Sequence, residues 1–365
     1  MTLLKTFKFA VAASAVAMTS MAGAQDYKDE YKLSLVVGTA FPWGQGAEIW
    51  ADMVRERTDG RINIKLYPGV SLVQGDQTRE FSALRQGVID MAVGSTINWS
   101  PQIQELNVFS LPFLTTTFAG TDAITQGEVG KKLFEIIEQK GAIPLAWGEN
   151  GFRQLSNSKR IIDSPKDLKG MKIRVVGSPL FIDTFTALGA NPTQMSWADA
   201  QPALASGAVD GQENPLSIFV AAKMQNLEQK YITRWNYMND PLVFVVNKDV
   251  WASWSEDDQK IVRQSAIDAA AKQIEIARKP LVEDIVEMGV GVTETLRGYP
   301  SFLRDADAFG EAVGQARVVT GRDGQRKRVA AESALIVTTS GMLAGGPVHS
   351  YLPKIRGSPT NLVTL

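Results

Sequence analysis

Two arginines and an asparagine near the middle of the chain have the chemistry to hold an anion. Arg153 follows a glycine-containing run, Arg174 lies in the strand-like Lys-Ile-Arg-Val-Val, and Asn214 precedes Pro215 at the end of a glycine-bounded loop. A guanidinium group donates two parallel hydrogen bonds to a carboxylate, and an amide nitrogen can add another. A surface ion pair is the alternative for each arginine taken alone. Together they predict the anion-holding side of a ligand cleft.

A second kind of chemistry would use paired carboxylates. Asp210 and Glu213 lie three residues apart, as in a hydrolase that works with two acids, although acids around a turn more often cap a helix or pair with arginine. The chain has no cysteine and one histidine, His349, which excludes thiolate and histidine-based metal sites and leaves a Ser-His-Asp triad without support. No phosphate-binding glycine loop is present. We therefore predict no enzyme activity, no metal and no cofactor.

The first residues predict export. Lys5 and Lys8 precede an apolar run at residues 9–18, and a small-x-small cleavage site follows at residues 22–24, so residues 1–24 resemble a signal peptide. The run is too short to span a bilayer, which takes about 20 residues. A net charge of −1 gives no reason to expect binding to nucleic acid or to an anionic membrane surface. No later segment is long enough to span a bilayer, so we expect no direct membrane insertion. An exported, soluble protein with a small-molecule partner is the expectation.

The elements that must position these side chains follow an alternating order. Strands at 31–37, 62–66 and 88–93 alternate with helices at 47–58 and 76–86. A helix at 121–140 and a strand at 143–147 precede the central stretch, where a strand at 171–176, helices at 178–188 and 197–206, and a turn at 211–215 are expected. This order predicts an α/β fold with mostly parallel sheets and flanking helices. Ligands of such sheets bind beyond the carboxyl ends of the strands, so the polar residues 94–99 are either a binding loop or an ordinary one.

A short internal repeat indicates two similarly wound domains. Residues 84–90 (Leu-Arg-Gln-Gly-Val-Ile-Asp) match residues 204–210 (Leu-Ala-Ser-Gly-Ala-Val-Asp) in spacing, and we expect each helix-to-strand turn to face one cleft. A strand at 241–247 returns the chain to the first domain. From Ser255 an amphipathic helix is predicted to about Met288, kinked or split at Pro280, lying across both lobes.

The end of the chain differs in character. Residues 298–365 contain no tryptophan, their binary patterning fades, and a basic run occupies residues 320–328. The hypothesis is an atypical tail produced by a frameshift near residues 296–300 and poorly ordered, with a basic interaction patch as the alternative. Translating the neighbouring reading frames of the gene tests it.

Several motifs together resemble one family. They are Asp-Leu-Lys-Gly-Met-Lys-Ile-Arg-Val (167–175), Ala-Leu-Gly-Ala-Asn-Pro-Thr (187–193) and Val-Asp-Gly-Gln-Glu-Asn-Pro (209–215), supported by residues 86–90 and 151–153. Over residues 31–294 the chain resembles the DctP-like solute-binding subunits of tripartite ATP-independent periplasmic (TRAP) transporters. The resemblance implies a two-lobed, type II-like periplasmic binding protein that closes on a small organic acid and delivers it to a membrane permease. The family's long helix after about Leu296 has no counterpart here, in keeping with the frameshift hypothesis.

The resemblance also assigns site residues. It implies that Arg174 pairs with the ligand carboxylate, with Arg153 and Asn214 near it and Trp197 where the family usually has phenylalanine. Polar residues after the third strand would select the far end of the ligand. The predicted binding set is Arg174, Arg153, Asn214, Trp197, Asn150, Thr96, Asn98 and Trp43.

The implied organisation has lobe I at 25–149 and 240–275, and lobe II at 150–239 and 276–297, with hinge strands near Trp147 and Pro241. The ligand would be a C4-dicarboxylate-like acid, another short dicarboxylate or a sugar acid. A secreted hydrolase and the binding component of another transporter type remain the alternatives.

Overall fold

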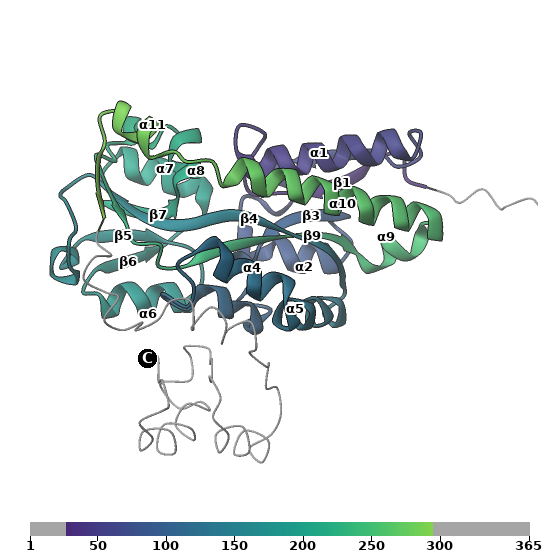
Figure 1. The fold of residues 1–365 in the computed structure, drawn as a ribbon, viewed down its shortest axis with the longest axis horizontal. Coiled ribbons are helices and arrows are strands. Elements are labelled where there is room, and N and C mark those ends of the chain that lie inside the picture. The colour runs from purple at the N-terminus through teal and green to yellow at the C-terminus, as the bar shows by residue number, and fades with distance from the viewer. Residues whose placement is uncertain (1–26, 295–365) are drawn as a thin grey trace, which may run out of the picture.

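One mixed sheet runs through both lobes of the molecule (Figure 1). The computed structural model describes residues 27–294, so the predicted signal peptide and the tail at 298–365 lie outside the described residues. Within the described part ten strands pair, with β2-β1-β3-β9-β4-β7-β5-β6 as the main order and β8 and β10 to one side. Strands β2, β1, β3, β9 and the first half of β4 form lobe I, and the remainder forms lobe II.

Lobe I is built from β1 (Tyr31–Ser34), α1 (Pro42–Arg57), β2 (Ile64–Tyr67), α2 (Glu80–Arg85), β3 (Met91–Ser95) and α3 (Thr96–Trp99). Strand β1 pairs in parallel with β2 and β3. Helices α4 (Phe118–Gln126) and α5 (Glu128–Gln139) replace the single helix predicted at 121–140, because the chain leaves helical geometry at Gly127. Apolar side chains on the two sheet faces form separate core clusters, one with α1 and the other with α2 and α5.

Strand β4 (Ala142–Asn157) belongs to both lobes. Its first half pairs with β9 (Asn239–Asn247), and its second half pairs with β7 and β8. The sequence predicted a strand ending near Trp147, but irregular registers at 144/146 and 149/151 let pairing continue through the glycines. Because β4 and β9 run antiparallel to their neighbours, the sheet is mixed, and the mostly parallel expectation holds only for the outer strands of each lobe.

Lobe II contains β5 (Lys172–Val175), α6 (Pro179–Ala187), β6 (Asn191–Gln194), α7 (Trp197–Ala205), β7 (Gly211–Pro215), α8 (Leu216–Ala221), β8 (Tyr231–Arg234) and β10 (Gly291–Glu294). The turn predicted at 211–215 was wrong, because these residues pair with both β4 and β5 as a buried strand. Short 3-10 turns occur at Pro68–Val73, Gln77–Arg79, Gln104–Ser110, Pro165–Leu168 and Met224–Leu227.

The C-terminal helices divide between the lobes (Figure 1). After α9 (Lys248–Ser253), helix α10 (Glu256–Ala277) packs beside α1, with Val262, Ala266 and Ala269 in the lobe I core. The helix ends before Pro280, and α11 (Val282–Glu287) packs into lobe II through Ile285. The predicted split is confirmed, but one helix across both lobes is not what forms. In the described part of the chain, no helix has the length and apolarity to cross a membrane.

The internal repeat is a structural repeat. The backbone amide of Lys32 donates to the Asp90 carboxylate at 2.8 Å, and that of Lys172 donates to Asp210 at 2.9 Å. Glycine in the left-handed region precedes each aspartate, at Gly87 and Gly207. Both aspartates precede the amino ends of their strands, β3 and β7. These turns therefore lie at the end of each sheet opposite the carboxyl ends, and the expectation that they face the cleft was wrong.

Candidate ligand site

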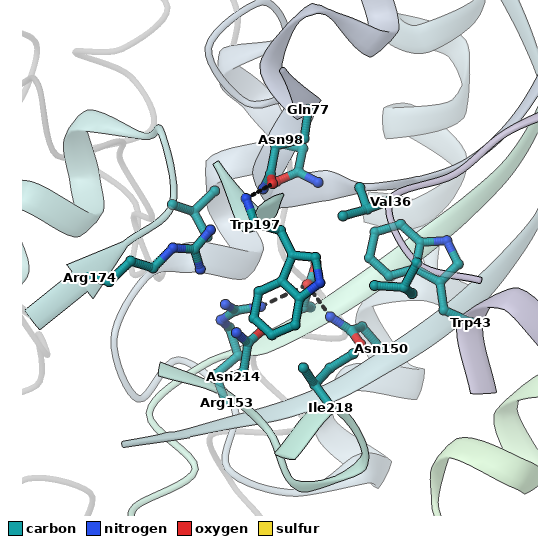
Figure 2. A pocket seen from close by; sticks show the side chains of 13 residues that line it. Val36, Trp43, Gln77, Asn98, Asn150, Arg153, Arg174, Trp197, Asn214 and Ile218 are labelled. Carbon is teal, nitrogen blue, oxygen red and sulfur yellow. Dashed lines mark hydrogen bonds and ion pairs between the residues drawn. The ribbon is translucent and has the colours of Figure 1, made fainter. Parts of the chain in front are cut away.

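A cavity of about 320 Å³, including its opening to solvent, lies between the lobes (Figure 2). Both lobes and the two strands that join them contribute to its wall. The lining residues are Val36, Val37, Trp43, Gln77, Asn98, Asn150, Arg153, Arg174, Val176, Trp197, Asn214, Ile218 and Asp240. Seven of the eight predicted binding residues are among these.

Arg174 is a buried cation that faces this cavity. Strand alternation puts Ile173 and Val175 into the lobe II core and leaves Arg174 on the opposite face, as predicted. Its side chain is 1 % exposed, and its Nε and Nη2 donate to the Met195 carbonyl oxygen at 3.1 and 2.9 Å. Among the described residues no carboxylate pairs with it. Burial, together with the charge of Arg153, lowers the pKa of Arg174 to about 10.

Arg153, by contrast, is neutralised by the protein itself. It makes a two-pronged ion pair with Glu213, and its Nη1 lies 3.0 Å from Asp240 Oδ2. The Tyr237 hydroxyl donates to Glu213 at 2.7 Å. Burial opposes the charge of Arg153, but the two acids outweigh it and raise its pKa. Arg153 lines the cavity, but its charge is already paired with two acids, whereas the charge of Arg174 can still pair with a ligand anion.

The two tryptophans flank the cavity. Trp43, at the start of α1, donates its indole N–H to the Val93 carbonyl at 2.7 Å, which fixes its ring. Trp197 begins α7, and the Arg174 guanidinium lies 5.9 Å from its ring centre. At the start of α7, the Trp197 backbone amide donates a hydrogen bond to Gln77 Oε1 at 2.9 Å. That bond joins the lobes.

Of the residues that follow β3, some line the cavity and others are buried away from it. Asn98 lines the cavity and accepts a hydrogen bond from Gln77 at 2.7 Å. Thr96 is buried at the first position of α3 and is not among the lining residues. Trp99 packs in the core of lobe I and donates to Glu80.

Two polar lining residues were not found from the sequence. Gln77 lies in a polar run with no recognisable motif, and only its three-dimensional position beside α7 gives it a role. Asp240 directly precedes Pro241, where the sequence predicted the strand to begin, and it lies inside β9 because the strand starts at Asn239. A carboxylate at the start of a buried strand was the available signal.

The paired-carboxylate arrangement does not form. Glu213 is buried in an ion pair with Arg153. Asp210 lies before the amino end of β7 and accepts a hydrogen bond from the Lys172 amide. Residues 27–294 also contain no cluster of three acidic or histidine side chains that could hold a metal ion.

Comparisons with known proteins agree on one family. The sequence model for "Bacterial extracellular solute-binding protein, family 7" (DctP) matches residues 33–295. The Escherichia coli 2,3-diketo-L-gulonate-binding periplasmic protein YiaO is 30 % identical over 312 residues, which are 85 % of this chain and 90 % of that protein.

Two solved structures extend the likeness. A TRAP periplasmic solute-binding protein from Ralstonia eutropha, with bound (S)-2-acetolactate, is 62 % identical with a TM-score of 0.75, covering 79 % of this chain and 96 % of that one. The sugar acid binding protein of Advenella mimigardefordensis, in complex with galactonate, is 28 % identical with a TM-score of 0.72, covering 78 % and 96 %. This chain therefore belongs to the family 7 extracellular solute-binding proteins, the DctP family of TRAP transporter solute-binding subunits.

Proposed function

We propose that this protein captures a small organic acid in the periplasm and delivers it, chemically unchanged, to a TRAP membrane permease. One observation carries the proposal: Arg174 presents a buried guanidinium without an acidic partner, among the described residues, at a cavity between two lobes. A buried charge without a partner is costly, and an incoming carboxylate supplies the missing partner with two parallel hydrogen bonds. The predicted binding set, with Thr96 left out, is the proposed site.

The ligands of relatives support this chemistry. Acetolactate, galactonate and 2,3-diketo-L-gulonate, named for the three relatives above, all carry a carboxylate.

Capture works through closure of the lobes. Gln77 contacts Trp197 across the cavity, and Ser100 Oγ lies 3.3 Å from Ser178 Oγ, so the described conformation is a closed one. A ligand that contacts both lobes stabilises this conformation relative to an open one. Of the predicted lobe boundaries, 149/150 falls within β4 and 239/240 at the start of β9, and these two strands are the proposed hinge; the third, 275/276, falls near the end of α10.

Calorimetric titration of the full chain with 2-acetolactate, pantoate, succinate and galactonate tests the proposal. We expect at least one acid to bind, and Arg174→Gln to weaken that binding at least ~30-fold while the fold is retained. Arg55→Gln, on the exposed face of α1, is the matched control and should leave affinity unchanged. If no acid binds, or if Arg174→Gln binds as tightly as the native chain, the proposal is wrong.

A further inference from the structure

We propose that Gly177 is the position that permits lobe closure. Because it has no side chain, lobe II can approach Thr78 of lobe I, and Gly177 thereby sets the affinity for a captured acid without contacting it. The inference rests on the proposed function and concerns its closing step. Gly177 follows β5 and is not among the residues that line the cavity. Thr78 lies in the 3-10 turn Gln77–Arg79.

A side chain at Gly177 has no room in the closed conformation. A Cβ atom there would lie 2.8 Å from Thr78 Cγ2 and 2.9 Å from Gln194 Nε2, and real Cβ atoms essentially never come closer than 3.0 Å to another heavy atom. Gln194 belongs to lobe II and is exposed on β6, so the end of its long side chain can turn aside. The contact that remains is the one between the lobes, with Thr78.

Thr78 is held in place by its own lobe. Its hydroxyl donates to Asp76 Oδ1 at 2.7 Å, and its backbone amide donates to the same atom at 3.0 Å. Its carbonyl accepts from Gln102 Nε2 at 2.6 Å, and Gln102 Oε1 accepts from Ser82 Oγ at 2.6 Å. Rotating the Thr78 side chain to move its methyl group would break the hydroxyl bond. The methyl group therefore does not make way for a side chain at Gly177.

The backbone of Gly177 does not itself require glycine. Its φ angle lies outside the left-handed region, so alanine suits the local conformation. An added methyl group would meet lobe I only when the lobes are closed. Its steric cost therefore falls on the closed state and leaves the open state unchanged.

Gly177 is connected to the cavity through β5. Arg174 lies on that strand, Val176 lines the cavity, and Gly177 is the next residue. When a ligand carboxylate pairs with Arg174 and draws the lobes together, the end of the same strand must approach lobe I. The fit at Gly177 thus limits how far the lobes can close around the ligand.

Two hydrogen bonds between the lobes flank this contact. Gln77, the residue before Thr78, accepts from the Trp197 amide at 2.9 Å. Ser100 Oγ donates to Oγ of Ser178, the residue after Gly177, at 3.3 Å. Because the steric contact lies between these bonds, separating the lobes enough to admit a methyl group would lengthen both.

A binding experiment tests the inference on the full chain, with the tightest binder among 2-acetolactate, pantoate, succinate and galactonate. Gly177→Ala should weaken its affinity at least ~10-fold, because overpacking penalises the closed state. Trp43 and Trp197 line the cavity, so stopped-flow tryptophan fluorescence can follow capture. We expect faster dissociation with a nearly unchanged association rate, because the first encounter takes place in the open form. Thermal melting without ligand should match that of the native chain.

A second substitution separates closure from a merely local effect. Thr78→Ser removes Cγ2 and keeps the hydroxyl that bonds Asp76. Gly177→Ala combined with Thr78→Ser should return the affinity to within ~3-fold of native, and Thr78→Ser alone should change it by less than ~3-fold. Gly291→Ala is the matched control, since the nearest atom to its Cβ would be Tyr231 Cδ1 of lobe II, at an ordinary 3.4 Å.

Closure can also be measured without any ligand. The chain has no cysteine, so Ser100→Cys with Ser178→Cys introduces a single pair whose sulfur atoms meet only when the lobes close. The rate of disulfide formation in oxidised glutathione then reports the population of the closed state. Adding Gly177→Ala should slow this rate at least ~5-fold, and adding Thr78→Ser as well should restore it.

The inference is wrong if Gly177→Ala binds the acid as tightly as the native chain, if Thr78→Ser does not restore the affinity, or if Gly177→Ala leaves the disulfide rate unchanged. Acid capture by the native chain stands in each of these cases. Absence of binding by all four acids would instead remove the proposed function, and the disulfide rates would still decide whether Gly177 permits closure.

Discussion

At the scale of single residues, Glu80 is, like Arg174, a buried ionisable side chain that has no ion-pair partner among the described residues. Its Oε1 accepts from Ser34 Oγ at 2.7 Å and its Oε2 from the Trp99 indole at 3.1 Å, and it is fully buried. Within the described residues it has no basic partner. Burial raises the pKa of Glu80 to about 7, against which the two hydrogen bonds act only partly.

This residue predicts a pH dependence of stability. The pKa of Glu80 is near 4.5 in the unfolded chain and about 7 in the folded protein, so the folded state binds this proton more tightly. The stability that Glu80 contributes is therefore fully present below pH 4.5 and is lost as pH rises through about 7. The free energy of unfolding of Glu80→Gln should therefore fall by about 3 kcal/mol less than that of the native chain over this pH range. Urea unfolding of native and variant chains between about pH 4.5 and pH 8 measures the difference. Parallel pH profiles for the two proteins would contradict the prediction.

The sequence could identify charged site residues but not their partners. Arg174 and Arg153 appear equivalent in the chain, each in a strand-like run, and alternation places each on a polar face. Their difference arises because β7 brings Glu213 against Arg153, whereas Arg174 donates to a backbone carbonyl and has no carboxylate partner within residues 27–294. Such pairing depends on sheet register, which local sequence does not encode.

At the scale of elements, Gln273 of α10 bonds the backbone of β4. Gln273 is fully buried and bonds both backbone groups of Glu149: it accepts from the amide at 2.8 Å and donates to the carbonyl at 2.6 Å. The bonds occur beside the irregular register of β4 at 149/151, where ladder pairing is interrupted. Gln273 therefore replaces a missing strand partner.

We expect Gln273→Ala to destabilise the protein by about 2–4 kcal/mol, since it leaves two buried backbone groups without partners. Gln264→Ala, on the exposed side of α10, should change the free energy of unfolding by less than about 0.5 kcal/mol. Chemical denaturation of the two variants gives the comparison. Equal stability of the two would show that β4 does not depend on this contact.

Sequence patterns predicted most elements but misread two strands at the cavity. Gly148 and Gly151 in β4, and the Gly-Gln-Glu-Asn-Pro of β7, have the composition of turns. Each strand nevertheless has partners on both sides or along its length, and those long-range pairings override the local preference. The helices, whose apolar spacing is local, were predicted more closely.

At the scale of the whole molecule, closure depends on contacts between the lobes. Gln77 makes one of them, because it bonds Asn98 in its own lobe and the Trp197 amide in the other. The internal repeat in the sequence indicated two similar lobes correctly. Which surfaces of the lobes meet depends on long-range geometry, and Gln77 lies outside every sequence motif from which the site was predicted.

We expect Gln77→Ala to weaken binding of any captured acid by about 10-fold, since the closed state loses two hydrogen bonds while the open state loses fewer. Calorimetry measures the affinity, and small-angle scattering measures the compaction that ligand produces. Gln86→Ala, exposed in the same lobe, is the control. An unchanged affinity in Gln77→Ala would show that this contact does not stabilise closure.

The insertion of β9 between β3 and β4 has a consequence for biogenesis. A chain made from its amino terminus produces β1 to β4 first, but the gap in their sheet is filled only when residues 239–247 have been synthesised. All strands of lobe II except β10 precede that point. The lobe whose residues are translated first is thus completed late, and a nascent chain stalled before β9 would present two unpaired strand edges to chaperones and proteases.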